Sequence, residues 1–296
     1  MLARRLGSSK KGNRDGQADQ LAEREFKFTD SDFAYICGLV ADKTGIVLSE
    51  AKRTMVYSRL ARRLRALKLK EFSSYVDRIK AGDEAELIEF TNALTTNLTS
   101  FFREQHHFDF LRKTVLPHLR QTKTDKRIRI WSAGCSSGEE PYSIAMTVRD
   151  VFPSLSGWDI KILATDLDSN MVHRASEGIY TEERVEGLDA KHSKKWVKKG
   201  TGEHVGKIRI SNQLRDMITF KQLNLMHDWP MRGSFDFMFC RNVVIYFNKD
   251  TQRELFDRYA DIIASKGYLF IGHSESLHNV CDRFASLGQT IYQRKA

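Results

Sequence analysis

The hydrophobic pattern changes along the chain from a helical period to an alternation of strands and helices. From Phe28 to about Thr95, apolar residues recur at spacings of three and four, as in Phe33, Ile36 and Val40, which predicts three or four short helices. After about residue 127, short apolar runs alternate with helical stretches. This alternation is typical of an α/β domain with a mainly parallel sheet. We therefore expect a small all-α domain followed by an α/β domain.

The expected organisation has four parts. Residues 1–20 are polar and basic without periodicity, which predicts a disordered basic tail. Residues 21–95 form the helical N-terminal domain, 96–109 a linker, and 110–296 the α/β domain. Between about 180 and 221 the alternation lapses around a glycine-containing turn. This lapse predicts a small antiparallel β-subdomain inserted into the α/β domain.

The segment 128–146 reads as a strand, a turn of small residues and the start of a helix. Ser132 to Gly138 supply small side chains and two glycines, so that the backbone can approach a ligand closely. Glu139 and Glu140 then open the helix, and two carboxylates would repel a phosphate. A cationic nucleoside such as S-adenosylmethionine fits this turn better. The alternative is an ordinary strand, turn and helix without a ligand.

The net charge of +10 and the pI near 9.4 indicate an acidic partner, which could be nucleic acid, anionic lipid or an acidic protein surface. Much of this charge lies between Ala51 and Lys70, where eight basic residues occur without one acidic residue. The alternative for such a run is a solvated helix face. The four cysteines are widely separated and have no zinc-ligand spacing, so neither a disulfide framework nor a metal is expected.

Ligands of open α/β sheets bind at the carboxyl ends of the strands, so the residues that follow each expected strand are candidates for a site. Asp166 follows one strand and could receive a ribose hydroxyl or, alternatively, cap the next helix. The pairs 224–225 and 241–242 follow two later strands, and Tyr246 comes shortly after the second pair.

Four blocks of sequence carry a family resemblance. They are Thr96–Glu104, Gly138–Ser143, Cys240–Phe247 and Gly272–Ser276. Their order and spacing resemble the motifs of the chemotaxis receptor glutamate O-methyltransferases, the CheR family, from about Phe28 to the C-terminus. The resemblance implies a Rossmann-like S-adenosylmethionine-dependent methyltransferase domain with a β-subdomain insertion behind a helical domain. It also implies that the 96–109 linker contacts the cofactor.

The resemblance also assigns site residues. It implies cofactor contacts for Asn97, Thr99, Arg103, Glu139, Asp166, Asn224, Leu225, Arg241 and Asn242. It further places Arg103 and Tyr246 at the methyl-transfer centre. Without the motifs, Arg103 could instead form a salt bridge between the domains, and Tyr246 could be a core aromatic residue.

The chemistry of glutamate methylation agrees with this assignment. A glutamate side chain is ionised at pH 7, so its attack on the sulfonium methyl needs no general base. Positioning should dominate, with Arg103 orienting one carboxylate oxygen and Tyr246 donating a second hydrogen bond. The products are S-adenosylhomocysteine and a γ-glutamyl methyl ester, and both have lost a charge that held the substrates.

The resemblance implies two contacts with chemoreceptors. The basic helix would hold the glutamate-bearing receptor helices through Arg53, Arg59, Arg62 and Arg63, because opposite charges speed encounter. The turn at Gly200 and Gly202 resembles the loop of family members that bind a C-terminal receptor pentapeptide, which would add to the β-subdomain as a strand. A plain hairpin turn is the alternative.

Two other functions remain open on the sequence. A nucleic-acid methyltransferase is favoured only by the charge, and a non-catalytic receptor-binding module could use the same fold. We expect a monomeric cytoplasmic enzyme, without nucleic-acid binding or membrane insertion, that is recruited to membrane receptor arrays. His106 and His107 are adjacent and are expected to point to different helix faces, so no metal site is expected there.

Overall fold

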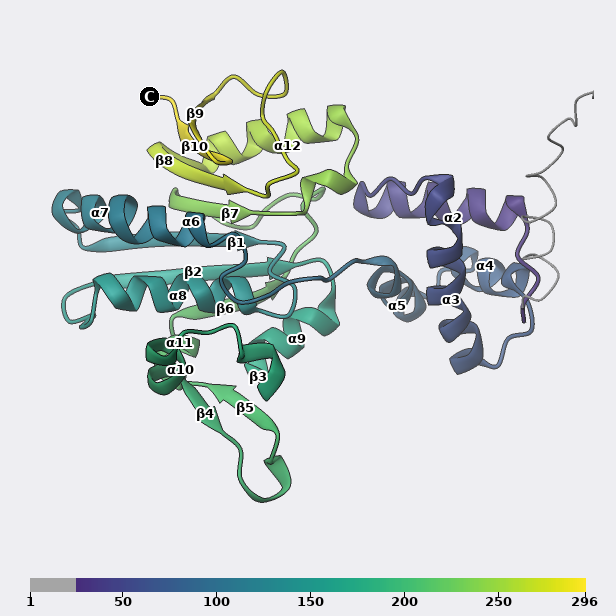
Figure 1. Cartoon of the computed structure of the whole chain (residues 1–296). Helices are drawn as coiled ribbons and strands as arrows, with labels where there is room; N and C mark the ends of the chain where they lie inside the picture. Colours follow the sequence, from purple (N-terminus) through teal and green to yellow (C-terminus); the bar gives the residue numbers. More distant parts are fainter. Residues whose placement is uncertain (1–24) are drawn as a thin grey trace, which may run out of the picture.

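The computed structural model describes residues 25–296, and the predicted disordered tail of residues 1–20 lies outside them. Figure 1 shows a helical domain beside a larger α/β domain, with one linker passing between them. A small sheet projects from the lower edge of the α/β domain in this view. This is the expected fold class: an all-α domain, a mixed sheet of Rossmann type and a separate antiparallel subdomain.

The N-terminal domain consists of short helices around a buried aromatic and aliphatic cluster. Its elements are α2 (Asp30–Thr44), η1 (Glu50–Lys52), α3 (Arg53–Leu67), α4 (Phe72–Lys80) and α5 (Glu84–Leu94). Thr29 caps α2 in a capping box with Asp32, and Gly45 ends it in the left-handed conformation. Val56, Leu60 and Leu64 form the buried stripe of α3, which leaves most of its arginines toward the surface.

The central sheet of the α/β domain has seven strands in the order β6-β2-β1-β7-β8-β10-β9. The strands are β1 (Arg127–Ala133), β2 (Asp159–Asp166), β6 (Ile218–Gln222), β7 (Phe235–Cys240), β8 (Ile263–Ile271), β9 (Phe284–Gly288) and β10 (Ile291–Arg294). The first five in this order run parallel, whereas β10 is antiparallel to both of its neighbours. The strand order reverses direction between β1 and β7, which is where such sheets bind ligands.

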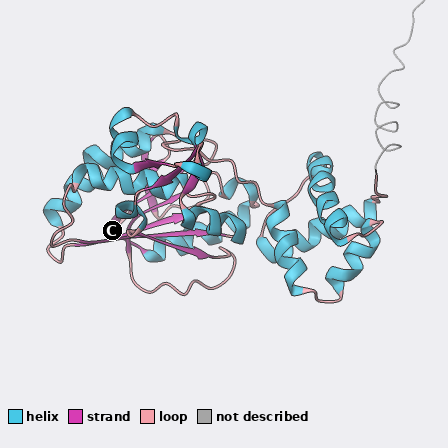
Figure 2. Ribbon diagram, turned by 90° about the horizontal axis from the view of Figure 1, so that it is seen from below, coloured by secondary structure: helices cyan, strands magenta, loops and turns pink. Residues whose placement is uncertain are grey.

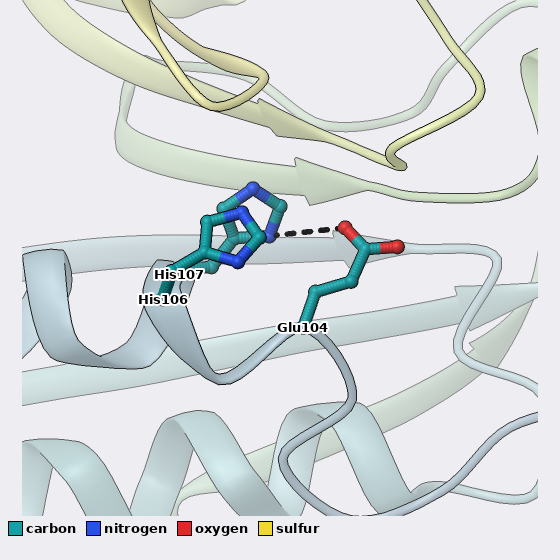
Figure 3. A group of neighbouring side chains, drawn as sticks. All are labelled: Glu104, His106 and His107. Carbon is teal, nitrogen blue, oxygen red and sulfur yellow. Dashed lines mark ion pairs between the residues drawn. The ribbon is translucent and has the colours of Figure 1, made fainter.

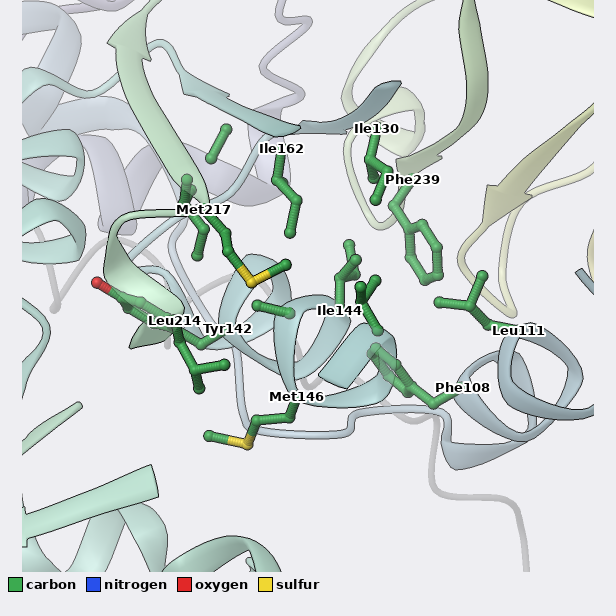
Figure 4. Packing of buried hydrophobic residues seen from close by; sticks show 14 of the residues in the cluster. Phe108, Leu111, Ile130, Tyr142, Ile144, Met146, Ile162, Leu214, Met217 and Phe239 are labelled. Carbon is green, nitrogen blue, oxygen red and sulfur yellow. The ribbon is translucent and has the colours of Figure 1, made fainter. Parts of the chain in front are cut away.

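Helices cover both faces of this sheet (Figure 2). They are α6 (Gln105–Phe110), the π-helical turn η2 (Leu111–Val115), α7 (Leu116–Thr122), α8 (Glu139–Val151), α9 (Ser169–Glu177) and α12 (Lys249–Ile262). Strand residues alternate between two cores: Ile130 faces α6 and α8, and Trp131 faces α12. Figure 4 shows Phe108, Ile144 and Phe239 meeting in the first core. In residues 25–296, no helix has the length and apolar character that crossing a membrane requires.

The inserted subdomain is a three-stranded antiparallel sheet in the order β3-β5-β4. Its elements are β3 (Ile179–Thr181), η3 (Glu182–Val185), α10 (Ala190–Trp196), β4 (Val197–Lys199), η4 (Gly202–His204), β5 (Lys207–Ile210) and α11 (Asn212–Arg215). The sequence placed the end of the insertion near residue 221, but β6 pairs in parallel with β2. The stretch 218–222 therefore belongs to the central sheet, because its register extends β2 rather than the small sheet.

Candidate active site

A cavity lies between the helical domain and the carboxyl ends of the parallel strands. Its walls come from the segment after α2, the linker, the turn after β1, and the ends of β2, β6 and β7. The two domains touch beside it, because the Val47 amide donates to the Tyr246 carbonyl at 2.8 Å. A ligand bound there would contact both domains.

The floor of the cavity is the turn between β1 and α8. Gly134 and Gly138 have φ of 83° and 99°, which side-chain-bearing residues rarely adopt. The Asp166 carboxylate accepts from the Ser136 amide at 2.7 Å and from the Asp168 amide at 2.9 Å. Burial raises the pKa of Asp166 to about 6. Asp166 lines the cavity but does not cap α9, because Asp168 is the N-cap.

The two glutamates that open α8 have different surroundings. Glu139 is fully buried and does not line the cavity; it accepts from Ser137 Oγ at 2.7 Å and pairs with Arg184 at 3.3 Å. Glu140 lines the cavity, and burial raises the pKa of its carboxyl. The family resemblance assigns the cofactor contact to Glu139, whereas Glu140 is the glutamate that lines the cavity. Consecutive helix residues point about 100° apart, so two adjacent glutamates with the same local sequence signal can have different surroundings.

Arg241 follows β7 and is held between two carboxylates. Its Nη1 donates to Glu140 Oε2 at 3.1 Å, and its Nη2 lies 3.4 Å from Glu104 Oε2. Nη2 also donates to the Arg103 carbonyl. The Arg241 side chain is thus almost wholly committed within the protein, and it braces the linker against the sheet. Neither Glu104 nor Glu140 was among the predicted site residues, although each adjoins one of them in the sequence.

The remaining predicted cofactor residues surround the same cavity: Asn97, Thr99, Asn224, Leu225 and Asn242. The Asn97 amide group donates to Asp168 Oδ2 at 2.8 Å, so the linker is fastened to the N-cap of α9. Asn224 Nδ2 donates to the Lys43 carbonyl at 2.6 Å, which connects the end of β6 to the helical domain. The structure therefore brings together every predicted cofactor residue except Glu139.

Arg103 and Tyr246 both line the cavity and both are half-buried. Arg103 Nη1 donates to the Leu98 carbonyl at 2.8 Å, and no ion pair forms at Arg103 within residues 25–296. It is therefore not the interdomain salt bridge that was the alternative. Tyr246 ends η5 (Val244–Tyr246) at the domain interface. Its partial exposure and its place on the cavity wall distinguish it from a core aromatic residue.

The four arginines predicted to hold substrate divide into two pairs. Arg53 is bound to Asp30 at 2.6 Å, and Arg63 is bound to Glu86 at 2.6 Å. Arg59 donates to the Thr95 carbonyl in the linker. Arg62 is exposed and forms no ion pair with any residue of the described chain. Arg53 and Arg63 thus have carboxylate partners within the protein, and Arg62 has the side chain that is most available to another molecule.

The turn at Gly200 and Gly202 lies between β4 and β5 at the tip of the inserted sheet (Figure 1). Gly202 has a φ of 60°. A Cβ added to Gly200 would lie 2.1 Å from the His204 carbonyl oxygen. Both positions therefore require glycine for the conformation of this loop, which lies apart from the cavity lining.

Glu104, His106 and His107 gather at the start of α6 (Figure 3). The expectation that the two histidines point to different faces is wrong: both Nε2 atoms lie within 3.2 Å of the Gln289 carbonyl oxygen. Adjacent helix residues point only about 100° apart, so both imidazoles can reach the same acceptor. The Glu104 carboxylate already has two partners, the Arg241 guanidinium at 3.4 Å and His273 Nδ1 at 2.9 Å.

The cavity lining fits S-adenosylmethionine chemically. Two carboxylates, Glu140 and Asp166, suit a cationic group and ribose hydroxyls. Burial raises the pKa of both carboxyls, and of the two only Glu140 has a cationic partner among the described residues, Arg241. Leu225 and Val243 supply apolar wall, and Asn97 and Asn242 supply amides. A bound cation would compensate the buried carboxylates.

Comparisons with known proteins agree with this geometry. Residues 97–293 match the CheR methyltransferase SAM binding domain, and residues 31–95 match the CheR methyltransferase all-alpha domain. Chemotaxis protein methyltransferase 2 of Pseudomonas aeruginosa is 42% identical, with 91% of this chain and 95% of that protein covered. The chemotaxis protein methyltransferase of Salmonella typhimurium is 41% identical, with coverage of 92% and 93%.

Among solved structures, magnesium protoporphyrin IX methyltransferase from Synechocystis with bound SAM is 15% identical. The superposition covers 68% of this chain and 84% of that protein, with a TM-score of 0.32. A score this low does not bear on function. The matches to both CheR domains and the two relatives above 40% identity carry the assignment. This chain belongs to the CheR family of S-adenosylmethionine-dependent protein methyltransferases.

Proposed function

We propose that this chain methylates glutamate side chains of chemoreceptors to γ-glutamyl methyl esters during chemotactic adaptation. The observation that carries the proposal is the joint presence of Arg103 and Tyr246 on the wall of a cavity whose acidic lining fits the cofactor. The names of the relatives, chemotaxis protein methyltransferases, support the process, and the family resemblance of the sequence motifs implies receptor glutamates as the substrates.

S-adenosylmethionine supplies the methyl group when it is bound. Arg103 holds one oxygen of the incoming glutamate carboxylate through its guanidinium, which leaves the other oxygen free to attack. The Tyr246 hydroxyl donates a second hydrogen bond that fixes the plane of the carboxylate. No proton has to be removed, because glutamate is already ionised at neutral pH. Catalysis by this chain therefore consists mainly of positioning.

The receptor helix docks, in this proposal, against the basic face of α3. Arg59 and Arg62 are the principal contacts, because Arg53 and Arg63 already have carboxylate partners. Burial lowers the pKa of Arg59, and the neighbouring Tyr246, which lines the cavity, acts in the opposite direction. This proximity to Tyr246 supports a role for Arg59 at the mouth of the site. Complementary charge would speed encounter with a glutamate-rich helix.

A receptor C-terminal pentapeptide is the second proposed contact. It would add as a strand to the sheet of β3, β4 and β5, beside the loop of Gly200 and Gly202. Both outer strands pair only with β5, so each has one edge without a partner strand among the described residues. Such a tether would hold the enzyme at receptor arrays. We further propose that it acts as a monomer, because one chain supplies the whole cavity lining.

The test is transfer of labelled methyl from S-adenosylmethionine to cytoplasmic receptor fragments, followed by mild alkali. We expect alkali-labile label with the wild-type chain and at least about 100-fold slower transfer with Arg103→Ala, because transition-state positioning is lost. Arg232→Ala is the matched control, since Arg232 is exposed and does not line the cavity. It should behave as wild type.

Two results would contradict the proposal. Labelling of RNA or DNA but of no receptor fragment would favour the nucleic-acid methyltransferase. Cofactor binding without transfer to any acceptor would favour a non-catalytic receptor-binding module.

A further inference from the structure

The carboxylate of Glu275 binds an unusual number of backbone amides. The side chain is 5% exposed and lies in the loop after β8, outside the cavity lining. Oε2 accepts from the amides of Gly272 at 2.5 Å and Asn242 at 3.0 Å, and Oε1 from those of Val243 at 2.9 Å, Val244 at 2.9 Å and Ile245 at 3.4 Å. Four of these five amides are consecutive in the loop of residues 241–246, which follows β7 and includes η5.

This loop carries predicted site residues into the cavity. Arg241 and Asn242 open it and Tyr246 ends it, and all three line the cavity. Asn242 has a φ of 59°, a left-handed conformation that costs free energy in a residue with a side chain, so contacts around it must hold it in place. Consecutive amides that converge on one anion form a backbone nest, and here the Glu275 carboxylate is the anion.

A second observation ties the same two loops together. A Cβ added to Gly272 would lie 2.5 Å from Asn242 Nδ2 and 2.9 Å from the Asn242 backbone nitrogen. The chain after β8 therefore approaches the Asn242 backbone as closely as a glycine allows. Three residues further on, Glu275 turns back to accept the amides, and its own amide donates to the Gly272 carbonyl at 2.9 Å.

We propose that Glu275 is a positioning residue that holds the backbone of 242–245, so that Asn242 and Tyr246 face the cavity in the arrangement that cofactor binding and methyl transfer require. It acts through these residues and contacts neither reactant. The role given to Tyr246 rests on the proposed function, whereas the bracing of the loop does not.

Glu275→Gln tests the proposal with little change of shape. A glutamine has a single acceptor oxygen, and its NH₂ group would face amides that are themselves donors, so at least one side of the nest loses its bonds. We expect hydrogen exchange of the amides at 242–245 to accelerate by at least about 10-fold, and the dissociation constant for S-adenosylhomocysteine to rise by about 10-fold. Glu275→Asp, which keeps both oxygens and the charge, should recover part of each loss.

The control is Glu254→Gln on the exposed side of α12, which removes the same charge without touching the loop. It should leave both readouts unchanged. Exchange and product binding need no methyl acceptor, so they test the bracing even if no receptor fragment is methylated. If Glu275→Gln does not fold, Glu275→Asp is measured in its place, with a smaller expected change of the same sign.

A double-mutant cycle separates positioning from general stability. If Glu275 acts through the loop, the loss of kcat caused by Glu275→Gln should shrink at least about threefold in a Tyr246→Phe background. Unchanged exchange at 242–245, or losses that add fully with Tyr246→Phe while the melting temperature falls, would overturn the proposal.

Discussion

Arg241 and Glu140 bind each other across the centre of the site, with Nη1 donating to Oε2 at 3.1 Å. The pair joins the end of β7 to the first turn of α8, and its side chains are 2% and 10% exposed. Ser132 Oγ also donates to Glu140 Oε1 at 2.7 Å. Glu140 is thus fixed in direction while its carboxylate still lines the cavity.

The first prediction compares the two adjacent glutamates. Glu140→Gln should weaken S-adenosylmethionine binding by about 10-fold or more, because it removes a buried charge that faces the cation. Glu139→Gln should change binding by less than about threefold, because Glu139 faces Ser137 and Arg184 instead. Isothermal titration of both variants checks this. A larger effect of Glu139→Gln would restore the assignment drawn from the sequence.

The second prediction concerns pH. Burial raises the pKa of Asp166 to about 6, so in the cofactor-free chain the carboxyl holds its proton below that pH. A bound cation favours the ionised form, so affinity for S-adenosylmethionine should rise by roughly 10-fold between pH 5 and pH 7. Equilibrium dialysis without a methyl acceptor measures it.

The stability of the cofactor-free chain should change with pH in the opposite direction. A carboxyl with a raised folded-state pKa stabilises the fold fully below its unfolded-state pKa, and this contribution is lost as the pH rises through about 6. Asp166→Asn should flatten both profiles, and Asp216→Asn, at an exposed position, should leave them unaltered. Glu140 should contribute to the greater stability at low pH in the same way, because burial raises the pKa of its carboxyl too.

Local sequence signals were enough to place the cofactor turn. The small residues up to Gly138 and the acidic pair after them predicted a helix that begins at Glu139, and α8 (Glu139–Val151) begins there. The sequence could not predict which partners each side chain of that helix contacts. Glu139 and Glu140 have the same local signal, and only the packing of Arg184 and Arg241 separates them.

Long-range contacts explain what the sequence could not supply. The Glu275 carboxylate accepts from the amides of residues 242–245, which lie at least 30 positions away in the sequence. Hydrophobic periodicity gives no signal for such a contact. The sequence offered Asp166 as a possible cap of the following helix, whereas Asp168, two residues later, is the N-cap of α9. The antiparallel strand β9 was not predicted, because only Phe284 of its five residues is buried.

The third prediction separates binding from stability on α3. Arg62→Ala should raise the KM for receptor fragments by about fivefold, with a smaller effect at high salt, and change stability by less than about 0.5 kcal/mol. Arg63→Ala should instead destabilise the chain by about 2 kcal/mol, because Glu86, 3% exposed, loses its cationic partner. Denaturant titration and steady-state methylation measure the two effects. Equal KM changes without a stability difference would contradict the division of these arginines.

The fourth prediction concerns the loop at the tip of the inserted sheet. Gly200→Ala would force its Cβ to within 2.1 Å of the His204 carbonyl oxygen, so the loop must move, and Gly202→Ala would strain a φ of 60°. Neither glycine lines the cavity, so methylation of receptor fragments without a C-terminal tail should remain within about twofold of wild type. If the β-subdomain holds the tail, the advantage that a tail gives should fall by at least about fivefold.

Gly157→Ala is the matched control for this loop, because Gly157 also has a positive φ, 75°, but lies in the connection between α8 and β2. It should carry a similar conformational cost and leave the tail advantage intact. Loss of the tail advantage in all three variants would point to general destabilisation. Retention in both loop variants would mean that the receptor tail binds elsewhere, and that Gly200 and Gly202 serve only the turn between β4 and β5.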